Sequence, residues 1–481
     1  MRHSNSRLLA ALTLLLIGSP AFGQPASLWS KTYGRDLNDQ FFNAATTADG
    51  GVAMVGLSFF LDTTRREDVS LIVTDSEGDS LWSRSYGTDQ FDYGSAVCIT
   101  RDGNIVVASY VSARGGTCWL TCFSPDGDSL WSRSLGEEYV GTWCWNLIAL
   151  EDGGLALSGY TARNDGITSN FWLAKTDSVG NLLWTRSYGD RLNMYCWGCT
   201  ETADGGFAMM GTGRLFESPE GNLLVIRTDA DGNELWSRYY FTTYWAGGSI
   251  VQTDDGGFAV AGTALQRNGW SDAYLTQLDS SGEVTWTQYY DHYVGDLCAK
   301  AVKSPYGGFL LVGSVQSEGN SERDGLMIRV DRDGNILWTD IIGAAESPQS
   351  FSTVLPADDG CYILAGANTV GNGFGSDFWL YKTDSDPASV NDRPVTPYSL
   401  GLSSFPSPFN SSTFVSYSTP FTGPLSATLV TIGGRELTKW TGLQAGKGRI
   451  MIDGAGLATG EYWLRLEQNG NTATTRLVLV R

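Results

Sequence analysis

The chain is poor in the side chains on which most catalytic and nucleic-acid-binding sites depend. Its 481 residues include 2 histidines, and only 17% of them are charged. The 52 acidic residues outnumber the 32 basic ones, and the net charge of −20 repels a phosphate backbone. Since His3 lies near the N-terminus, a Ser–His–Asp or Cys–His group would depend on His292 alone. We therefore expect neither nucleic-acid binding nor histidine-based catalysis.

Long apolar runs are also missing, with one exception near the N-terminus. The run from Leu8 to Ile17 is too short to anchor a protein in a bilayer. It follows Arg2 and Arg7 and precedes the small residues around Gly23, a pattern typical of a secretory signal peptide. We expect residues 1–23 to be removed on export, and we expect no transmembrane segment.

Cysteines are few, and their spacing gives little sign of a metal site. The chain has 8 of them, and Cys196 and Cys199 form a single Cys-x-x-Cys pair. A zinc knuckle would need a second such pair or nearby histidines. Cys144 and Cys196 share a register in neighbouring repeats and could bond to each other. We expect buried thiols together with one or two disulfides, and no metal or cofactor.

What the sequence has in abundance is a repeat of about fifty residues. An Asp or Ser is followed after three residues by Gly and after seven by Trp. The sets are Asp75/Gly78/Trp82, Ser124/Gly127/Trp131, Asp177/Gly180/Trp184, Asp229/Gly232/Trp236, Asp279/Gly282/Trp286 and Asp331/Gly334/Trp338. A fixed period of this length indicates a stacked or closed array of supersecondary units.

Each repeat has a second glycine turn, which precedes a short apolar run. The turn glycines are Gly50, Gly103, Gly153, Gly205, Gly256, Gly307 and Gly360, and six residues later come Gly56, Ser109, Gly159, Gly211, Gly262, Gly313 and Gly366. Another strand pattern ends at the Asp-x-x-Gly turn, and the Trp strand follows it. Four strands per repeat and seven repeats predict an all-β fold: a seven-bladed β-propeller over residues 24–386 with the Trp strand outermost.

The two ends of the array predict how the propeller closes. The last repeat has Asn391 where its Trp is expected, whereas an unpaired Trp strand, residues 27–31, precedes the first repeat. We expect this N-terminal outer strand to complete the seventh blade, because closure removes exposed sheet edges. An open β-solenoid, the alternative, has no need of a split repeat.

A proline-bearing linker, residues 387–398, separates the array from a second β-rich unit. In residues 399–481, apolar and polar residues alternate in several short strands, which predicts a small immunoglobulin-like β-sandwich. Its distinctive motifs contain Pro408, Phe409 and Asn410, then Gly456, Leu457, Gly460 and Tyr462, and finally Arg476 in the terminal strand.

By these motifs and their order, residues 399–481 resemble the type A C-terminal sorting domain of the type IX (Por) secretion system. Ser407 and Ser411 stand where that family usually has Asn and Pro. The resemblance implies export by the signal peptide, recognition by the type IX machinery, and attachment to the cell surface or release. The propeller is similar to repeat propellers found ahead of such domains in Gram-negative bacteria.

The Asp-x-x-Gly-x-x-x-Trp turn has three interpretations. It is similar to the Trp-docking repeat of quinoprotein propellers and to the Asp-box of sialidases. A quinoprotein dehydrogenase would also need a pair of adjacent cysteines, and a sialidase would need a cluster of arginines. Neither is identifiable in this sequence. We favour a structural role, in which Asp accepts turn N–H bonds and Trp packs between blades. Turns such as 229–233 and 331–335 could hold calcium, but we expect them to be solvated.

The blade face opposite the Gly turns is rich in aromatic residues, and Asp92 lies among them. The candidates for ligand binding are Trp143, Trp145, Tyr195, Trp197, Tyr244, Trp245 and Tyr290. Trp143 and Tyr195 share a register, as do Trp145 and Trp197. Aromatic rings beside polar groups suit sugars, which stack on ring faces and form hydrogen bonds at their edges. We expect these residues in connecting loops on a rigid scaffold, as a carbohydrate- or protein-binding face.

Together these patterns predict a secreted or surface-attached binding or scaffold protein of a Gram-negative-type bacterium, and no enzymatic activity. The alternative is an exported propeller enzyme, either a glycan hydrolase that uses a carboxylate pair or a quinoprotein-like oxidoreductase.

Overall fold

The computed structural model describes residues 26–34, 39–59, 67–89, 91–112, 116–135, 141–162, 169–189, 194–214, 221–240, 245–265, 270–291, 295–316, 323–343, 349–357, 360–370, 375–384, 386, 401–405, 412–418, 425–431, 435–443, 447–468 and 471–480. The chain forms two compact units, residues 1–388 and 389–481, and the division falls within the predicted linker. All elements in the described ranges are strands, and no helix there could cross a membrane.

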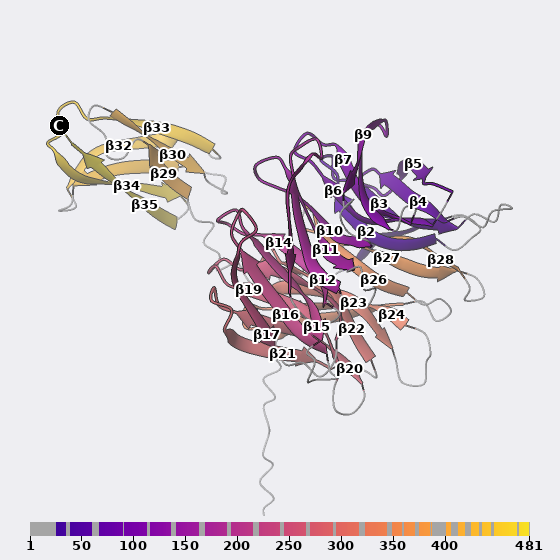
Figure 1. The fold of residues 1–481 in the computed structure, drawn as a ribbon. Helices are drawn as coiled ribbons and strands as arrows, with labels where there is room; N and C mark the ends of the chain where they lie inside the picture. The colour runs from indigo at the N-terminus through magenta and orange to yellow at the C-terminus, as the bar shows by residue number, and fades with distance from the viewer. Residues whose placement is uncertain are drawn as a thin grey trace, which may run out of the picture. The chain divides into compact units, whose positions relative to one another are not determined.

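Seven four-stranded antiparallel sheets make up the first unit, as the repeat predicts (Figure 1). Each sheet is one blade, and we number the blades in chain order. The first contains β2 (Asp39–Thr46), β3 (Val52–Phe59), β4 (Glu67–Thr74) and β5 (Ser80–Tyr86), the second β6 (Asp92–Ile99), β7 (Ile105–Val111), β8 (Thr117–Phe123) and β9 (Ser129–Leu135), and the third β10 (Thr142–Ala149), β11 (Leu155–Ala162), β12 (Ser169–Thr176) and β13 (Leu182–Tyr188). The fourth contains β14 (Met194–Glu201), β15 (Phe207–Arg214), β16 (Gly221–Thr228) and β17 (Glu234–Tyr240), the fifth β18 (Trp245–Gln252), β19 (Phe258–Leu265), β20 (Ser271–Leu278) and β21 (Val284–Tyr290), and the sixth β22 (Gly295–Lys303), β23 (Phe309–Gln316), β24 (Arg323–Val330) and β25 (Ile336–Ile342). The first strand of each sheet contacts the first strand of the next, so these inner strands surround the central axis of the ring, which we call the channel.

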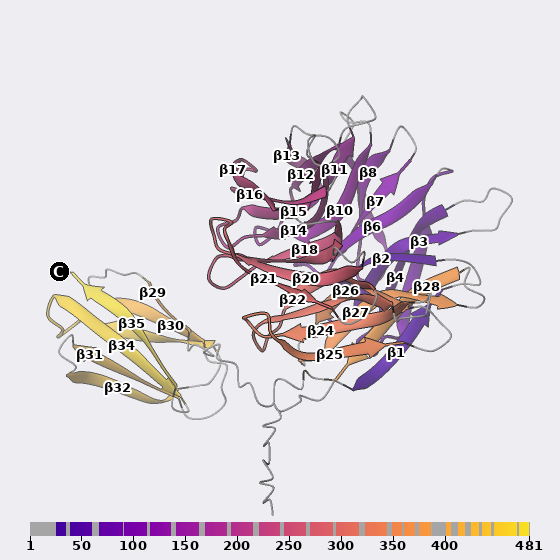
Figure 2. The same ribbon diagram turned by 90° about the horizontal axis from the view of Figure 1, so that it is seen from below.

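The seventh blade confirms the predicted closure. It contains β26 (Gln349–Pro356), β27 (Tyr362–Val370) and β28 (Gly375–Thr383), and the N-terminal strand β1 (Ser27–Tyr33) pairs antiparallel with β28. Figure 2 shows the indigo strand from the start of the chain beside the orange strands from the end of the array. Strand β26 contacts β2 of the first blade, which completes the ring.

The Asp-x-x-Gly turns have the structural role that we favour. In the fourth blade, Asp229 Oδ1 accepts hydrogen bonds from the backbone N–H groups of Asp231 at 2.9 Å and Asn233 at 2.8 Å. Gly232 has φ of 76°, a conformation that residues with a Cβ rarely adopt. The carboxylate therefore holds the turn that connects the third strand to the outer strand.

The tryptophans of the outer strands join neighbouring blades. A Cβ on Gly180 would lie 2.5 Å from the ring of Trp131, which belongs to the preceding blade. The same contact joins Trp29 to Gly78, Trp82 to Gly127, Trp184 to Gly232, Trp236 to Gly282 and Trp286 to Gly334. Glycine is thus required at each turn both for its conformation and for the ring that covers it. We call this repeated contact the rim.

The second unit is a small β-sandwich. One sheet contains β29 (Gly401–Phe405), β30 (Ser412–Ser418) and β33 (Lys447–Asp453). The other contains β31 (Leu425–Thr431), β32 (Glu436–Leu443), β34 (Gly460–Gln468) and β35 (Asn471–Leu479). Apolar side chains of both sheets share one core, as Val415 and Ile450 do with Leu464 and Leu477. The alternating pattern thus gave the correct fold for this unit.

The expectation of one or two disulfides is wrong. All eight cysteines lie in described parts of the chain, and all are free thiols. Cys144 packs with Cys118 in the core between the second and third blades, whereas Cys196 packs in the core between the third and fourth. The shared register of Cys144 and Cys196 therefore places them in different cores, where they cannot bond to each other.

Candidate ligand-binding site in the propeller channel

Every inner strand has a β-bulge at the same register. In the third blade the register shifts between Cys144 and Asn146, and Trp145 is the extra residue. The bulged residues are Phe42, Ser95, Trp145, Trp197, the pair Gly247 and Gly248, Ala299 and Ser352. A bulge bends its strand and re-aims a side chain. These positions therefore form a ring of redirected residues around the channel.

The rings at these bulges meet across the channel. The centroids of Phe42 and Trp145 are 6.3 Å apart, although the second blade lies between their blades. Trp145 in turn lies 5.6 Å from Trp197 of the fourth blade. The bulges of the fifth to seventh blades carry only small residues, among them Ala299 and Ser352. The ring of bulges therefore carries aromatic residues on one side and small residues on the other.

A second set of rings continues this aromatic wall. Trp143 stacks between Tyr110, at 5.2 Å and 9°, and Tyr160, at 4.9 Å and 18°. Tyr195 meets Tyr160 edge-on at 4.7 Å. We call the connected set the channel aromatics: Phe42, Tyr93, Tyr110, Trp143, Trp145, Tyr160, Tyr195 and Trp197. All eight are half-buried, so each retains some surface for a ligand.

Polar atoms along the same strands remain available for hydrogen bonds. The hydroxyl of Thr353, next to the bulge of the seventh blade, is buried and completes no hydrogen bond. The buried indole N–H of Trp145 lies beside the hydroxyl of Tyr160. Burial raises the pKa of Tyr160 to about 12, so its hydroxyl stays protonated at neutral pH. A buried hydroxyl such as that of Thr353 gains free energy from a partner that supplies the missing hydrogen bond.

The structure places four of the seven predicted ligand residues together. Trp143 and Trp145 lie on β10, and Tyr195 and Trp197 lie on β14, in the two shared registers that the sequence indicated. The predicted setting is wrong, because these residues belong to inner strands and not to loops. The bulge that turns their rings toward the channel has no sequence signal that we recognised.

The other three predicted ligand residues differ. Tyr290 is 3% exposed, and its hydroxyl donates to the carbonyl of Gly334 at 3.0 Å, so it holds two blades together and cannot contact a ligand. Trp245 begins β18, but its side chain lies outside the described residues, as does Tyr244 altogether. Sequence reasoning missed Phe42, Tyr93, Tyr110 and Tyr160, although their equivalent places in successive repeats could have shown them.

The sorting motifs are described only in part. Pro408, Phe409, Asn410 and His292 lie outside the described residues. Gly456 has φ of 83°, and the N–H of Leu457 donates to Gly454 at 3.0 Å. Gly460 begins β34, and the hydroxyl of Tyr462 donates to the carbonyl of Ala458 at 2.6 Å. Arg476 pairs with Glu461 on the sheet surface.

Metal-ligand groups are scarce in what the structure describes. Within the described ranges, no three His, Cys, Asp or Glu side chains are grouped to hold a metal ion. At the turns considered for calcium, the oxygens of Asp229 and Asp331 accept hydrogen bonds from their own turns.

Comparisons with known proteins identify the fold and no family. No family model matches the sequence, and no curated protein does. A copper-containing fungal alcohol oxidase matches over 95% of this chain and all of its own, with 11% identity and a TM-score of 0.51. A Dyadobacter fermentans protein of unknown function and the propeller domain of a Pyrococcus furiosus protease each cover 76% of this chain, with 11% identity. They match over 100% and 99% of their own lengths, with TM-scores of 0.45 and 0.43.

By its fold and site, the chain is thus a seven-bladed β-propeller with an aromatic channel, followed by a small β-sandwich. The similarity to these structures extends to the fold alone, since their sequences share so little with this one.

Proposed function

We propose that this protein is an exported binding protein whose channel aromatics take a carbohydrate chain. The observation that carries the proposal is the unequal distribution of aromatic residues around the channel. On the third and fourth blades, a half-buried aromatic wall contains Trp143, Trp145, Tyr195 and Trp197. On the fifth to seventh blades, the bulge positions carry only small residues. Sugar rings pack their C–H faces on indole and phenol rings. The indole N–H of Trp145, beside the hydroxyl of Tyr160, supplies a donor for a sugar hydroxyl. The proposed role is binding, without catalysis, a cofactor or a metal.

A glycan-array assay on the full-length protein tests this role. We expect saturable binding that the double variant Trp143→Ala/Trp197→Ala abolishes. Tyr289→Ala is the matched control, because Tyr289 is an aromatic residue that is 50% exposed on an outer strand. Absence of binding to any glycan, or binding that the double variant retains, would contradict the carbohydrate site and favour a protein ligand.

We further propose that residues 399–481 deliver the propeller to the cell surface or the medium by the type IX machinery, after the signal peptide of residues 1–23 has directed it across the inner membrane. The support is the resemblance of the motifs around Gly456, Gly460 and Tyr462 to that sorting family, together with a sandwich that has its own core.

Truncation after residue 398 tests the delivery. We expect the shortened protein to accumulate in the periplasm. Arg476→Ala should reduce surface delivery, whereas Arg465→Ala should not, since both arginines are exposed and ion-paired but only Arg476 belongs to the sorting motif. Unchanged surface delivery of the truncated protein would contradict the assignment.

A further inference from the structure

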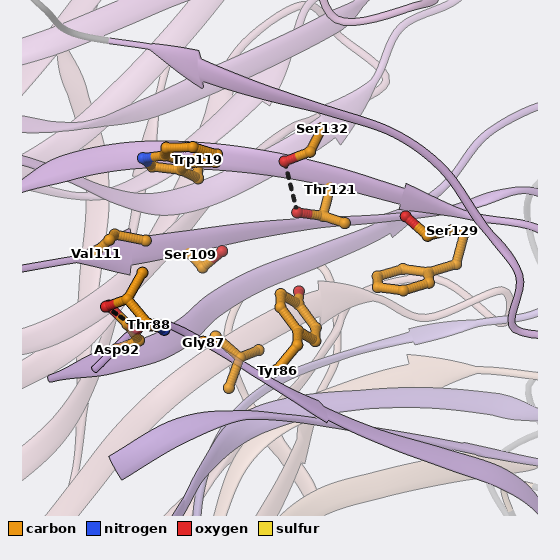
Figure 3. Close-up of a pocket in the computed structure, with 12 residues that line it drawn as sticks. Tyr86, Gly87, Thr88, Asp92, Ser109, Val111, Trp119, Thr121, Ser129 and Ser132 are labelled. Atoms are coloured by element: carbon orange, nitrogen blue, oxygen red, sulfur yellow. Dashed lines mark hydrogen bonds between the residues drawn. The ribbon is translucent and has the colours of Figure 1, made fainter. Parts of the chain in front are cut away.

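A cavity of about 300 Å³ lies in the seam between the first and second blades (Figure 3). Val69, Val111, Trp119 and Phe123 form apolar walls, and Asp92 lines one end. The hydroxyls of Ser132 and Thr121, 3.2 Å apart, line another part of the wall. The cavity shares no lining residue with the channel aromatics, and Asp92 is the one residue of the predicted binding face that lines it.

At this seam, the second blade lacks the glycine that the other blades have on their second strand. In five blades the glycine of the second strand faces a bulkier inner-strand residue, such as Cys144 opposite Gly159 or Phe351 opposite Gly366. In the second blade the order is reversed, and Gly94 faces Ser109. At this one position the inner strand therefore contributes no side chain to the seam, while a buried hydroxyl is added on the second strand.

Trp119 departs from its two counterparts. In the third and seventh blades, the equivalent Trp172 and Trp379 are 2% exposed and fill their seams. Their indole N–H groups donate to the hydroxyl after the rim tryptophan, Trp172 to Thr185 at 2.7 Å and Trp379 to Ser30 at 2.8 Å.

Trp119 instead donates to Thr117 on its own strand at 3.0 Å. The hydroxyl equivalent to Thr185 and Ser30 is that of Ser132, and it lines the cavity without an indole. In the third and seventh blades, the equivalent space and hydroxyl acceptor are occupied by an indole ring of the protein itself. In the second blade the same acceptor, Ser132, has no indole of the described residues bonded to it.

Tyr86 also departs from its counterparts. At the same place in four other blades, the tyrosine hydroxyl donates to the glycine carbonyl of the next rim turn: Tyr33 to Gly78 at 2.6 Å, Tyr188 to Gly232 at 2.7 Å, Tyr240 to Gly282 at 2.6 Å and Tyr290 to Gly334 at 3.0 Å. The hydroxyl of Tyr86 is not bonded to a rim carbonyl and instead faces Ser109 and Thr121 in the cavity wall (Figure 3).

Asp92 supplies a charge at the other end of the cavity. Its side chain is fully buried, and one oxygen accepts hydrogen bonds from the N–H and hydroxyl of Thr88. Its other oxygen, Oδ1, is buried without a hydrogen bond. An unsatisfied carboxylate oxygen in an apolar seam gains free energy from a charged donor.

We propose that this cavity binds an indole-class aromatic amine. The indole ring occupies the space that Trp172 and Trp379 fill in their seams, its N–H donates to Ser132, and its ammonium group donates to Asp92. The chemistry is that of tryptamine or of an N-terminal tryptophan of a peptide. This site goes beyond the proposed carbohydrate role and does not depend on it.

Calorimetric titration of the full-length protein with tryptamine, indole and the dipeptide amide Trp-Ala-NH2 tests the proposal. We expect saturable binding of tryptamine, about tenfold tighter than that of indole because of the ion pair. Tighter binding of the dipeptide than of tryptamine identifies a peptide as the source, and the reverse identifies a free amine. Failure of tryptamine to bind, or equal affinities for tryptamine and indole, would overturn the proposal.

Matched variants locate the ligand. Ser132→Val removes the indole acceptor and should weaken tryptamine binding roughly five- to tenfold. Ser83→Val alters the equivalent residue in the seam between the seventh and first blades and should change nothing. Asp92→Asn should lower tryptamine affinity to that of indole while indole binding persists, which shows that the cavity is intact. Unchanged affinity in both Ser132→Val and Asp92→Asn would overturn this placement.

Discussion

The outer strands of the blades repeat one set of contacts, whereas the inner strands differ from blade to blade. At the rim, a tryptophan of one blade covers a glycine turn of the next, from Trp29 on Gly78 to Trp286 on Gly334. Around the channel, the same bulge position holds Trp145 in one blade and Ala299 in another. Uniform positions thus hold the ring together, and both proposed binding sites lie where the repeat is broken.

The largest stability effect is expected at the end of the array. Arg329 and Asp386 form a buried ion pair at 2.6 Å, and the indole N–H of Trp338 donates to the same carboxylate at 3.0 Å. Asp386→Ala leaves a buried guanidinium without its partner and should lower the free energy of unfolding by about 3–5 kcal/mol. Urea unfolding measures the loss. A loss below about 1 kcal/mol would show that this contact is not part of what holds the ring.

A smaller effect separates the two glycine turns of one repeat. Gly180 has φ of 78° and lies under Trp131, whereas Gly153 has φ of 88° and nothing within 4 Å of a Cβ. Gly180→Ala should cost about 2–4 kcal/mol, from backbone strain and displacement of the ring. Gly153→Ala should cost about 1–2 kcal/mol from strain alone. Equal losses of stability in the two variants, measured by thermal unfolding, would contradict a stabilising role of the rim contact.

Removing single tyrosine hydroxyls sharpens the contrast between a regular and an irregular seam. Tyr188→Phe loses the hydrogen bond to Gly232 and should cost about 1 kcal/mol. Tyr86→Phe removes a hydroxyl that joins no rim carbonyl and faces only the cavity-wall hydroxyls of Ser109 and Thr121, so it should cost less than Tyr188→Phe. Chemical unfolding of both variants compares them directly, and a larger loss for Tyr86→Phe would contradict the difference between the seams.

The smallest effect is a pH dependence of the rim. A hydrogen bond from Asn233 lowers the pKa of Asp229, and one from Ser281 lowers that of Asp279. Because these folded-state pKa values lie below those of the unfolded chain, the contribution is present above pH about 4 and is lost as the pH falls through the folded-state values. The melting temperature should therefore fall as the pH is lowered from 7 to 2.5, and Asp229→Asn should make this fall smaller. A curve that Asp229→Asn leaves unchanged would count against this origin.

The repeat made the architecture predictable because its signals are local. A few neighbouring residues are enough to identify a glycine turn, an alternating strand or the unpaired strand around Trp29. The sheet order confirms the elements predicted in this way. The propeller could thus be predicted from the spacing of its repeat, and the sandwich from the alternation of apolar and polar residues.

The site could be predicted only in part because its determinants are not local. The bulge at Trp145 shows only in the pairing of two strands, so inner-strand rings were expected in loops. Tyr290 resembles its neighbours in sequence, and only its hydrogen bond to Gly334 shows that it joins two blades. Cys144 and Cys196 share a register, but the core on each side of the third blade separates them.

The most direct test of the account compares one channel tryptophan with one rim tryptophan. Trp197→Ala should abolish glycan binding, since Trp197 is one of the channel aromatics, and it should also lower stability by about 2–4 kcal/mol, since its partly buried ring packs against the core between the fourth and fifth blades. Trp236→Ala should lower stability by about 2–4 kcal/mol and keep glycan binding, since Trp236 covers Gly282 at the rim. Binding and thermal unfolding are measured on both full-length variants. Loss of binding in Trp236→Ala with retention in Trp197→Ala would contradict the division between rim and channel.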